Sequence, residues 1–272
     1  MKFISFGCWN KGDPTDPSLP LYHLLESLKS RLSVRDIDFV MITGDNYYYH
    51  NKKEQLKGYP LTKHIELENI RIPLEGGAGK KDKDSCDFSL LEKTFNHINE
   101  IGEIYEVPIY MCSGNHEYKS HTILNKPPEE ESPPVDVVRD PEDKEELLEY
   151  QKSLLKDSDT KYIEQGKLPY EEPTFYVINT EKGRLDMSFI EDEGDKHIYI
   201  FGHIPILSLN PKPKKGRIWD INEHLVTAFV KLEPNNITYI CADTHNYQDI
   251  EIIFQDDKKV RQFVIGSGGT FK

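Results

Sequence analysis

The sequence contains no apolar run that approaches the roughly 20 residues needed to span a bilayer. Residues 1–10 carry one lysine and only a few apolar side chains before the chain becomes polar, which is too little for the hydrophobic region of a signal peptide. We therefore expect no membrane partner and a cytoplasmic location.

Positive charge and cysteine are also scarce. The formal net charge is −13, whereas a protein that binds DNA or RNA needs a basic face to neutralise phosphates, so nucleic acid is not expected as the main partner. The four cysteines are spaced widely and irregularly, which excludes a disulfide framework and a Cys-x-x-Cys metal knuckle. We expect reduced thiols in a cytosol-like compartment.

Short apolar runs alternate with longer amphipathic stretches along the 272 residues. This alternation predicts a layered α/β fold in a single domain that spans residues 1–272. Two segments break it, a glycine-rich one at about 52–85 and a proline- and glutamate-rich one at about 125–146, and we expect both to be surface insertions. Strands are predicted at Lys2–Phe6, Asp38–Ile42, Pro108–Cys112, Thr174–Ile178, His197–Phe201, Ile237–Cys241, Ile250–Phe254 and Arg261–Ile265, and helices at Leu21–Leu32, Phe88–Ile101, Glu145–Leu155 and Ile221–Leu232.

Five of the predicted strands run directly into a small residue that is followed by side chains able to bind a metal ion. Because ligands bind at the carboxyl ends of strands in open α/β sheets, the five turns are expected to meet in one place. Their carboxylate, amide, imidazole, phenol and thiol groups suit a centre of two Zn, Fe or Mn ions. Such a centre needs a group that bridges ions about 3.5–4 Å apart, and Asp45 is the natural bridge. The turns are Gly7-Cys8-Trp9-Asn10, Gly44-Asp45-Asn46-Tyr47-Tyr48, Gly114-Asn115-His116-Glu117, Gly202-His203-Ile204-Pro205 and Ala242-Asp243-Thr244-His245.

The order and spacing of these turns resemble the calcineurin-like metallophosphoesterase superfamily, and most closely its purple acid phosphatase branch. The GDNFY motif of that branch is similar to Gly44–Tyr48, GNHE is matched by Gly114–Glu117, and GHxP by Gly202–Pro205. The last ligand motif, GHDHNxQ, is partly matched by Ala242–Gln248, and the closing (V/I)SGxGG is similar to Val264–Gly269. The resemblance covers almost the whole chain outside the two insertions.

The resemblance implies a four-layered α/β/β/α sandwich with two surface insertions and a metal-dependent phosphoesterase activity. A hydroxide activated by two transition-metal ions (Zn, Fe or Mn) would attack the phosphorus of a phosphorylated substrate. His116 would protonate the leaving oxygen or stabilise its charge, and Glu117 would hold the His116 imidazole in orientation. The implied ligands are Cys8, Asp45, Tyr48 and His245 for the first metal and Asp45, Asn115, His203 and Asp243 for the second.

Two implied ligands differ from the family pattern, which has Asp where Cys8 stands and His where Asp243 stands. A thiolate binds Zn or Fe well and a carboxylate coordinates through oxygen, so both positions keep a donor. The alternatives are that Cys8 packs as a small buried hydrophobe, that Asp243 serves a turn, and that Tyr47 or Tyr49 takes the place of Tyr48. Two functions therefore stay open. One is an acid-phosphatase-like hydrolase of a monoester, diester or nucleotide, and the other is a catalytically impaired protein of the same fold that serves as a binding or structural module.

Overall fold

The computed structural model describes residues 1–10, 12–47, 64–67, 70–73, 85–118, 122–124, 146–156, 158–181, 183–191, 194, 196–209, 219–255 and 257–266, with the backbone alone for 64–67, 70–73, 85–88, 122–124 and 146. The chain divides into two compact units. The first consists of Met1–Tyr48, Leu90–Lys119 and Lys144–Lys272, and so contains every implied ligand. The second consists of Tyr49–Ser89 and Ser120–Asp143.

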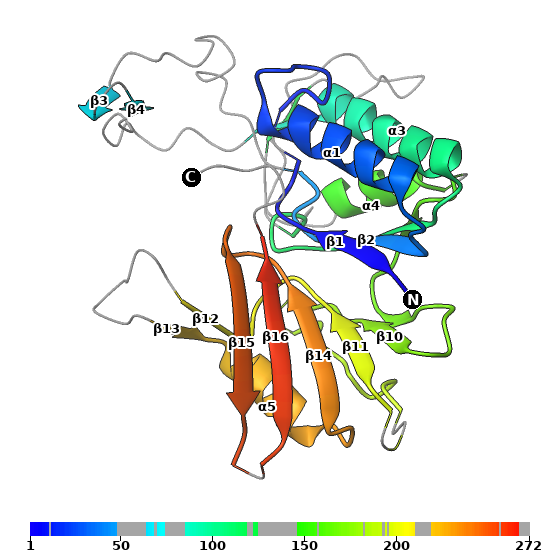
Figure 1. The fold of residues 1–272 in the computed structure, drawn as a ribbon, viewed down its shortest axis with the longest axis vertical. Coiled ribbons are helices and arrows are strands. Elements are labelled where there is room, and N and C mark those ends of the chain that lie inside the picture. The colour runs from blue at the N-terminus through cyan, green and yellow to red at the C-terminus, as the bar shows by residue number, and fades with distance from the viewer. Residues whose placement is uncertain are drawn as a thin grey trace. The chain divides into compact units, whose positions relative to one another are not determined.

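The first unit contains a sheet of four parallel strands (Figure 1). The strands lie in the order β1 (Phe3–Phe6), β2 (Phe39–Thr43), β6 (Ile109–Cys112) and β8 (Lys161–Tyr162). One face of this sheet is covered by the helices α1 (Pro20–Val34), α3 (Phe88–Tyr105) and α4 (Glu146–Leu154). Helix α1 buries Leu21, Leu25, Leu28 and Leu32, because residues three and four positions apart share one face of a helix.

A second sheet of the same unit has six strands. Their order is β15 (Tyr247–Ile253), β16 (Lys259–Ile265), β14 (Asn236–Cys241), β11 (Ile198–Phe201), β10 (Thr174–Val177) and β9 (Gly166–Lys167). The four central strands are parallel, and each outer strand is antiparallel to its neighbour. Helix α5 (Glu223–Lys231) packs on one face through Leu225 and Phe229, which share a core cluster with Ile200 and Tyr239.

The remaining faces of the two sheets meet in an aromatic core. Because successive residues of a strand point to opposite faces, Tyr199 and Phe201 face the first sheet while Ile200 faces α5. The ring of Phe39 in the first sheet lies 5.1 Å from that of Phe175 in the second, in an edge-to-face contact. The layers therefore run helix, sheet, sheet, helix (Figure 1), which confirms the predicted four-layered α/β/β/α sandwich.

All the predicted strands and helices of the first unit are present, with their ends shifted by a few residues. The sequence patterns do not predict the short strands β8, β9, β12 (Leu207–Leu209) and β13 (Trp219–Ile221). The helix predicted at Ile221–Leu232 begins instead at Glu223, because residues 219–221 pair with β12 in an antiparallel ribbon.

The second unit contains two pairs of strands. Strand β3 (His64–Leu67) pairs antiparallel with β4 (Ile70–Pro73), and β5 (Ser85–Asp87) pairs parallel with β7 (Thr122–Leu124). The rest of the segment at 52–85 and nearly all of that at 125–146 lie outside the described residues, so the single domain with two insertions stays a prediction. Within the described ranges, no helix has the length and apolar character to cross a membrane.

Candidate metal centre

The carboxyl ends of five strands of the first unit meet at one place, as the five turns predicted. The Cys8 N–H donates to the main-chain oxygen of Gly44 at 3.1 Å, which joins the turns after β1 and β2. The Ala242 N–H donates to the oxygen of His203 at 2.8 Å, which joins the turns after β14 and β11. The side chains that follow these ends are Cys8 (β1), Asp45 (β2), Asn115 (β6), His203 (β11), and Asp243 and His245 (β14).

Four of these residues hold the backbone in the left-handed region. The φ angle is 51° at Cys8, 50° at Asp45, 56° at Asp243 and 51° at His245. Residues other than glycine adopt this conformation rarely, and each instance costs on the order of 1 kcal/mol. The side chains of these strained turns point toward a common centre. Strained backbone conformations of this kind are found mainly at functional sites.

The first group of donors consists of Cys8, Asp45 and His245. The Cys8 sulfur, a carboxylate oxygen of Asp45 and a ring nitrogen of His245 lie within 4.8 Å of one another. Cys8 and Asp45 are buried, His245 is half-buried, and the Cys8 thiol lies 3.8 Å from Asp45 Oδ2. A sulfur, an oxygen and a nitrogen at this spacing can surround one Zn or Fe ion. Tyr48, the fourth implied ligand of this metal, lies outside the described residues.

The second group consists of Asp45, His203, Asp243 and Asn115. His203 Nε2 lies 3.2 Å from Asp45 Oδ1 and 3.8 Å from Asp243 Oδ1. The Asn115 side-chain amide donates to the same Asp243 oxygen at 3.4 Å. Asp45 therefore turns Oδ2 toward Cys8 and Oδ1 toward His203, so its two oxygens are divided between the two groups.

The His203 ring is fully buried and joins the turn after β11 in the second sheet to the end of β2 in the first. Its Nδ1 lies 2.8 Å from the main-chain oxygen of Thr43. Because a carbonyl only accepts, Nδ1 carries a proton, and Nε2 is the nitrogen left to bind a metal. Burial lowers the pKa of this imidazole, but the negative charges of Asp45 and Asp243 outweigh it and raise the pKa to about 9. A cation at Nε2 would satisfy the same two carboxylates.

Two buried atoms of the second group make no hydrogen bond to any other described residue. They are Asn115 Oδ1 and His203 Nε2, which faces Asp45 without the alignment of a hydrogen bond. Buried polar atoms are nearly always satisfied, so each exception needs an explanation. Asn115 Oδ1 carries lone pairs of the type that metals accept, His203 Nε2 offers one once a binding metal displaces its proton, and both lie beside carboxylates. The residues present therefore fit a bound metal.

His116 borders the centre. Its side chain is partly exposed, with Nε2 3.9 Å from Asp45 Oδ2, and its main-chain N–H donates to Asp45 Oδ1 at 3.1 Å. An imidazole at the rim of a metal centre can reach both the solvent and a bound phosphate ester. The position therefore suits the predicted role of His116 toward a leaving group.

Glu117 has a different role from the one expected. Its buried carboxylate accepts the main-chain N–H groups of Asn46 at 2.8 Å and Gly114 at 2.6 Å, and the Gln151 amide at 3.4 Å. It thus joins the turns after β2 and β6 and positions Asp45 and Asn115, rather than orienting the His116 imidazole. Burial and then the charge of Asp45 raise the pKa of Glu117 to about 7.

Sequence reasoning missed two residues that hold these turns. Asn46 is fully buried, donates to the main-chain oxygen of Cys112 at 2.8 Å, and accepts the Trp9 indole N–H at 3.2 Å. Gln151 is also fully buried, on the same helix as the buried Leu147 and Leu148. An amide among the apolar residues of a helix is a readable signal, because a buried polar side chain needs a partner.

The family model described as Calcineurin-like phosphoesterase matches residues 12–247. The matched span contains six of the seven implied ligands and begins after Cys8, one of the two positions where the sequence departs from the family pattern. No curated protein matches the chain. The match confirms the resemblance at the level of the superfamily, and the purple acid phosphatase branch stays a prediction.

Proposed function

Because the chain belongs to the calcineurin-like phosphoesterase family, we propose that it hydrolyses phosphate esters at a centre of two transition-metal ions that share Asp45. The family itself indicates metal-dependent phosphoester hydrolysis. The pair of ions, the acid-phosphatase-like preference for monoesters and a phosphorylated substrate are the finer parts of the proposal. The alternative is a chain that keeps the fold but does not turn over substrate.

One observation carries the proposal, namely the division of the Asp45 carboxylate between two donor groups. Oδ2 faces the Cys8 thiol, and Oδ1 faces the His203 imidazole. A carboxylate that offers one oxygen to each of two ions is the bridge that a two-metal site needs. Cys8 and His245 would complete the ligand set of one ion, and Asn115, His203 and Asp243 would complete that of the other.

The protein's own residues divide the remaining work. Bound ions would lower the pKa of a coordinated water toward neutrality and supply positive charge to the phosphoryl oxygens. The Thr43 oxygen keeps the His203 proton on Nδ1, so that Nε2 stays available. Glu117 holds the turns that carry Asp45 and Asn115. His116, at the rim, protonates the leaving oxygen.

The thiol makes this donor set softer than one with a carboxylate in its place. Cys8 is fully buried and packs against Ala242, so its sulfur is shielded from solvent. Thiolate ligands favour Zn and Fe over Mn. We therefore expect the purified protein to contain Zn or Fe in preference to Mn.

The test combines metal analysis with hydrolysis of an aryl phosphate by the whole chain. Asp45→Asn should lose metal and lower turnover by at least about 10³-fold, because both ions share this residue. The matched control is Asp249→Asn, which removes a carboxylate that pairs with Arg261 on strands β15 and β16 of the same unit. Fewer than one metal per chain, with no turnover in added Mn, Zn or Fe, would end the proposal. Unchanged turnover in Asp45→Asn would assign the activity to a contaminant.

A further inference from the structure

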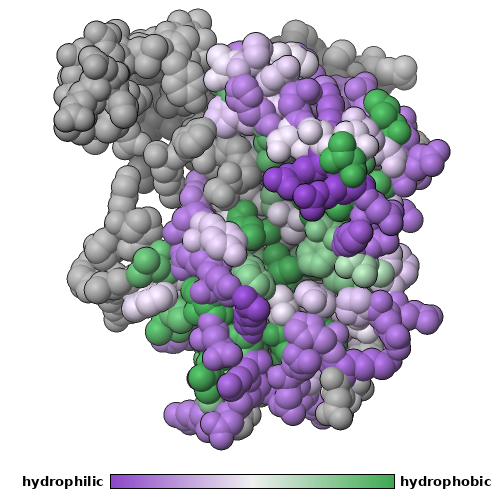
Figure 2. All heavy atoms as spheres, viewed as in Figure 1, coloured by the Kyte–Doolittle hydropathy of each residue, from purple (hydrophilic) through white to green (hydrophobic). Residues whose placement is uncertain are grey.

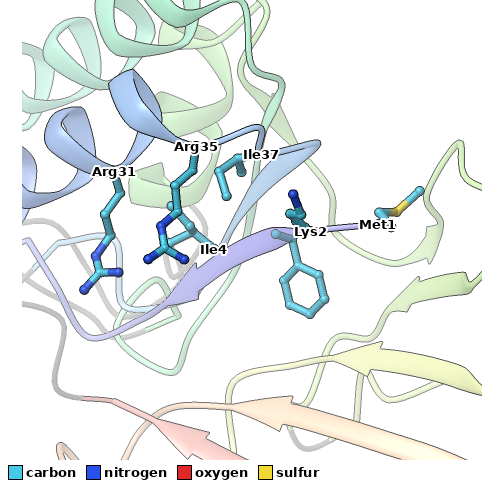
Figure 3. A pocket seen from close by; sticks show the side chains of 7 residues that line it. Met1, Lys2, Ile4, Arg31, Arg35 and Ile37 are labelled. Atoms are coloured by element: carbon cyan, nitrogen blue, oxygen red, sulfur yellow. The ribbon is translucent and has the colours of Figure 1, made fainter.

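A second place in the first unit has the features of a binding site. It is a pocket of about 410 Å³ at the start of strand β1, between that strand and the end of helix α1 (Figure 3). The walls combine three cations, Lys2, Arg31 and Arg35, with the apolar side chains of Phe3, Ile4 and Ile37. Cys8 lies beyond the other end of β1, so this pocket is separate from the metal centre.

The cations of the pocket are available to a ligand. Arg31 and Arg35 are exposed and form no ion pair with any other described residue. Arg31 lies in the last turn of α1, Arg35 is the extended residue that caps this helix, and both side chains extend toward β1 in Figure 3. Figure 2 shows strongly hydrophilic side chains over α1 on the face that also contains β1. The nearby carboxylate of Asp38 already accepts the main-chain N–H of Lys2 at 2.5 Å.

The strand beside these cations is the outer strand of its sheet. In the described part of the chain β1 pairs only with β2, so its second edge has no strand partner. An outer strand presents main-chain N–H and C=O groups to any extended chain that lies alongside it. Phe3 and Ile4 are half-buried and point to opposite faces, so Phe3 packs on the aromatic core between the sheets while Ile4 lines the pocket.

We propose that an extended acidic segment of a partner protein adds to the free edge of β1, with its carboxylates paired to Arg31 and Arg35. Strand addition supplies main-chain hydrogen bonds, and side-chain pockets supply specificity. Arginine favours this pairing because its planar group binds a carboxylate through two parallel hydrogen bonds.

The spacing of the two arginines specifies the sequence that would bind. The Cα atom of a C-cap residue still follows the helix, so the Cα atoms of Arg31 and Arg35 are about 5–6 Å apart along the helix axis. Alternate side chains on one face of a strand are separated by about 6.6 Å, which is close to that distance. The segment should therefore carry an acidic residue at every second position facing α1. The residues between them should be apolar, since they face the side on which Phe3 lies.

The experiment uses the full chain and a labelled seven-residue peptide of alternating glutamate and valine, capped at both ends. Fluorescence anisotropy should show saturable binding. Arg31→Glu and Arg35→Glu should each weaken it by about tenfold or more, because a charge-assisted bond is replaced by repulsion. The matched control is Lys231→Glu, an exposed cation in the last turn of α5, which should leave binding unchanged. Of two peptides methylated at alternate main-chain nitrogens, one at the glutamates and one at the valines, the peptide whose methyl groups face β1 should not bind.

Several results would overturn the proposal. If the peptide showed no saturable binding below millimolar concentration, the proposed binding site would be refuted. If Lys231→Glu weakened peptide binding as much as the arginine variants, the peptide would be attracted by the overall charge of the protein and not by this site. Full binding of both methylated peptides would exclude strand addition. Displacement of the unmethylated peptide by low millimolar inorganic phosphate would identify a small-anion site instead. Circular dichroism of each variant separates a lost site from a lost fold.

Discussion

Gly114→Ala should damage the metal centre without changing any donor. A Cβ at residue 114 would lie 2.3 Å from the main-chain nitrogen of Asp45, 2.4 Å from Asp45 Oδ1 and 2.9 Å from His203 Cε1. Ordinary contacts of a Cβ begin near 3.4 Å, so the Asp45 carboxylate would have to retreat by about 1 Å. Overpacking of this kind costs about 1–3 kcal/mol of stability.

The larger effect should fall on activity. A displacement of about 1 Å in a catalytic arrangement can lower the rate by about 10²-fold. Gly114→Ala should therefore reduce turnover of an aryl phosphate by about that factor and weaken metal binding, while the melting temperature falls by only a few degrees. Activity assays, metal titration and thermal unfolding measure the three quantities.

A control separates crowding at the centre from general strain. Gly183 has a φ of +86°, and a Cβ built there meets nothing within 4 Å. Gly183→Ala should cost about 1 kcal/mol of backbone strain and leave turnover and metal affinity intact. If Gly114→Ala kept wild-type turnover and metal affinity, the close packing of Gly114 on Asp45 would not be what positions the carboxylate.

Three further variants test individual side chains of the centre. Cys8→Ser should lower the ratio of bound Zn to Mn, measured by elemental analysis after incubation with both ions, and an unchanged ratio would place the thiol outside the centre. His116→Asn should slow hydrolysis of an alkyl phosphate by about 10²-fold but that of nitrophenyl phosphate much less, because a good leaving group needs no proton; equal losses would contradict this role. The pKa of Glu117 is raised to about 7, so the metal-free folded state retains a proton there that the unfolded chain releases above its ordinary value of 4.5. The contribution of Glu117 to the stability of the folded protein therefore decreases as pH rises from about 4.5 to 7. Glu117→Gln should abolish that decrease, measured as the melting temperature of the metal-free protein at each pH. If the melting temperatures of wild type and variant changed with pH in the same way, the raised pKa of Glu117 would be refuted.

The strand and helix patterns predicted a layered α/β fold and turns that meet at one edge, whereas the four-layered arrangement was implied by the family resemblance. Strands such as Phe39–Thr43 are nearly continuous apolar runs, and parallel strands bring their carboxyl ends to one edge. A glycine and a polar residue directly after such a run, as in Gly44-Asp45, therefore lie at the edge of the sheet where the other strands also end. This reasoning needs no knowledge of side-chain direction, which is why it succeeded.

The contacts within the centre were not predictable in the same way. Glu117 follows His116, and nothing in the order of residues shows that its carboxylate accepts the N–H groups of Asn46 and Gly114. The Nδ1 proton of His203 is likewise fixed by a main-chain oxygen 160 residues away. Turns lack the regular period of helices and strands, so the sequence does not tell which way their side chains point.

The left-handed turns also restrict how this centre can change over time or by design. Replacement of Cys8, Asp45, Asp243 or His245 by glycine would relieve about 1 kcal/mol of backbone strain but would remove a metal-binding side chain. Valine or isoleucine would add strain and supply no donor, whereas Asn and Asp tolerate the conformation and still offer an oxygen. Gains in stability and retention of donors therefore oppose each other at the same four positions, so substitutions that stabilise this protein should be sought elsewhere in the chain.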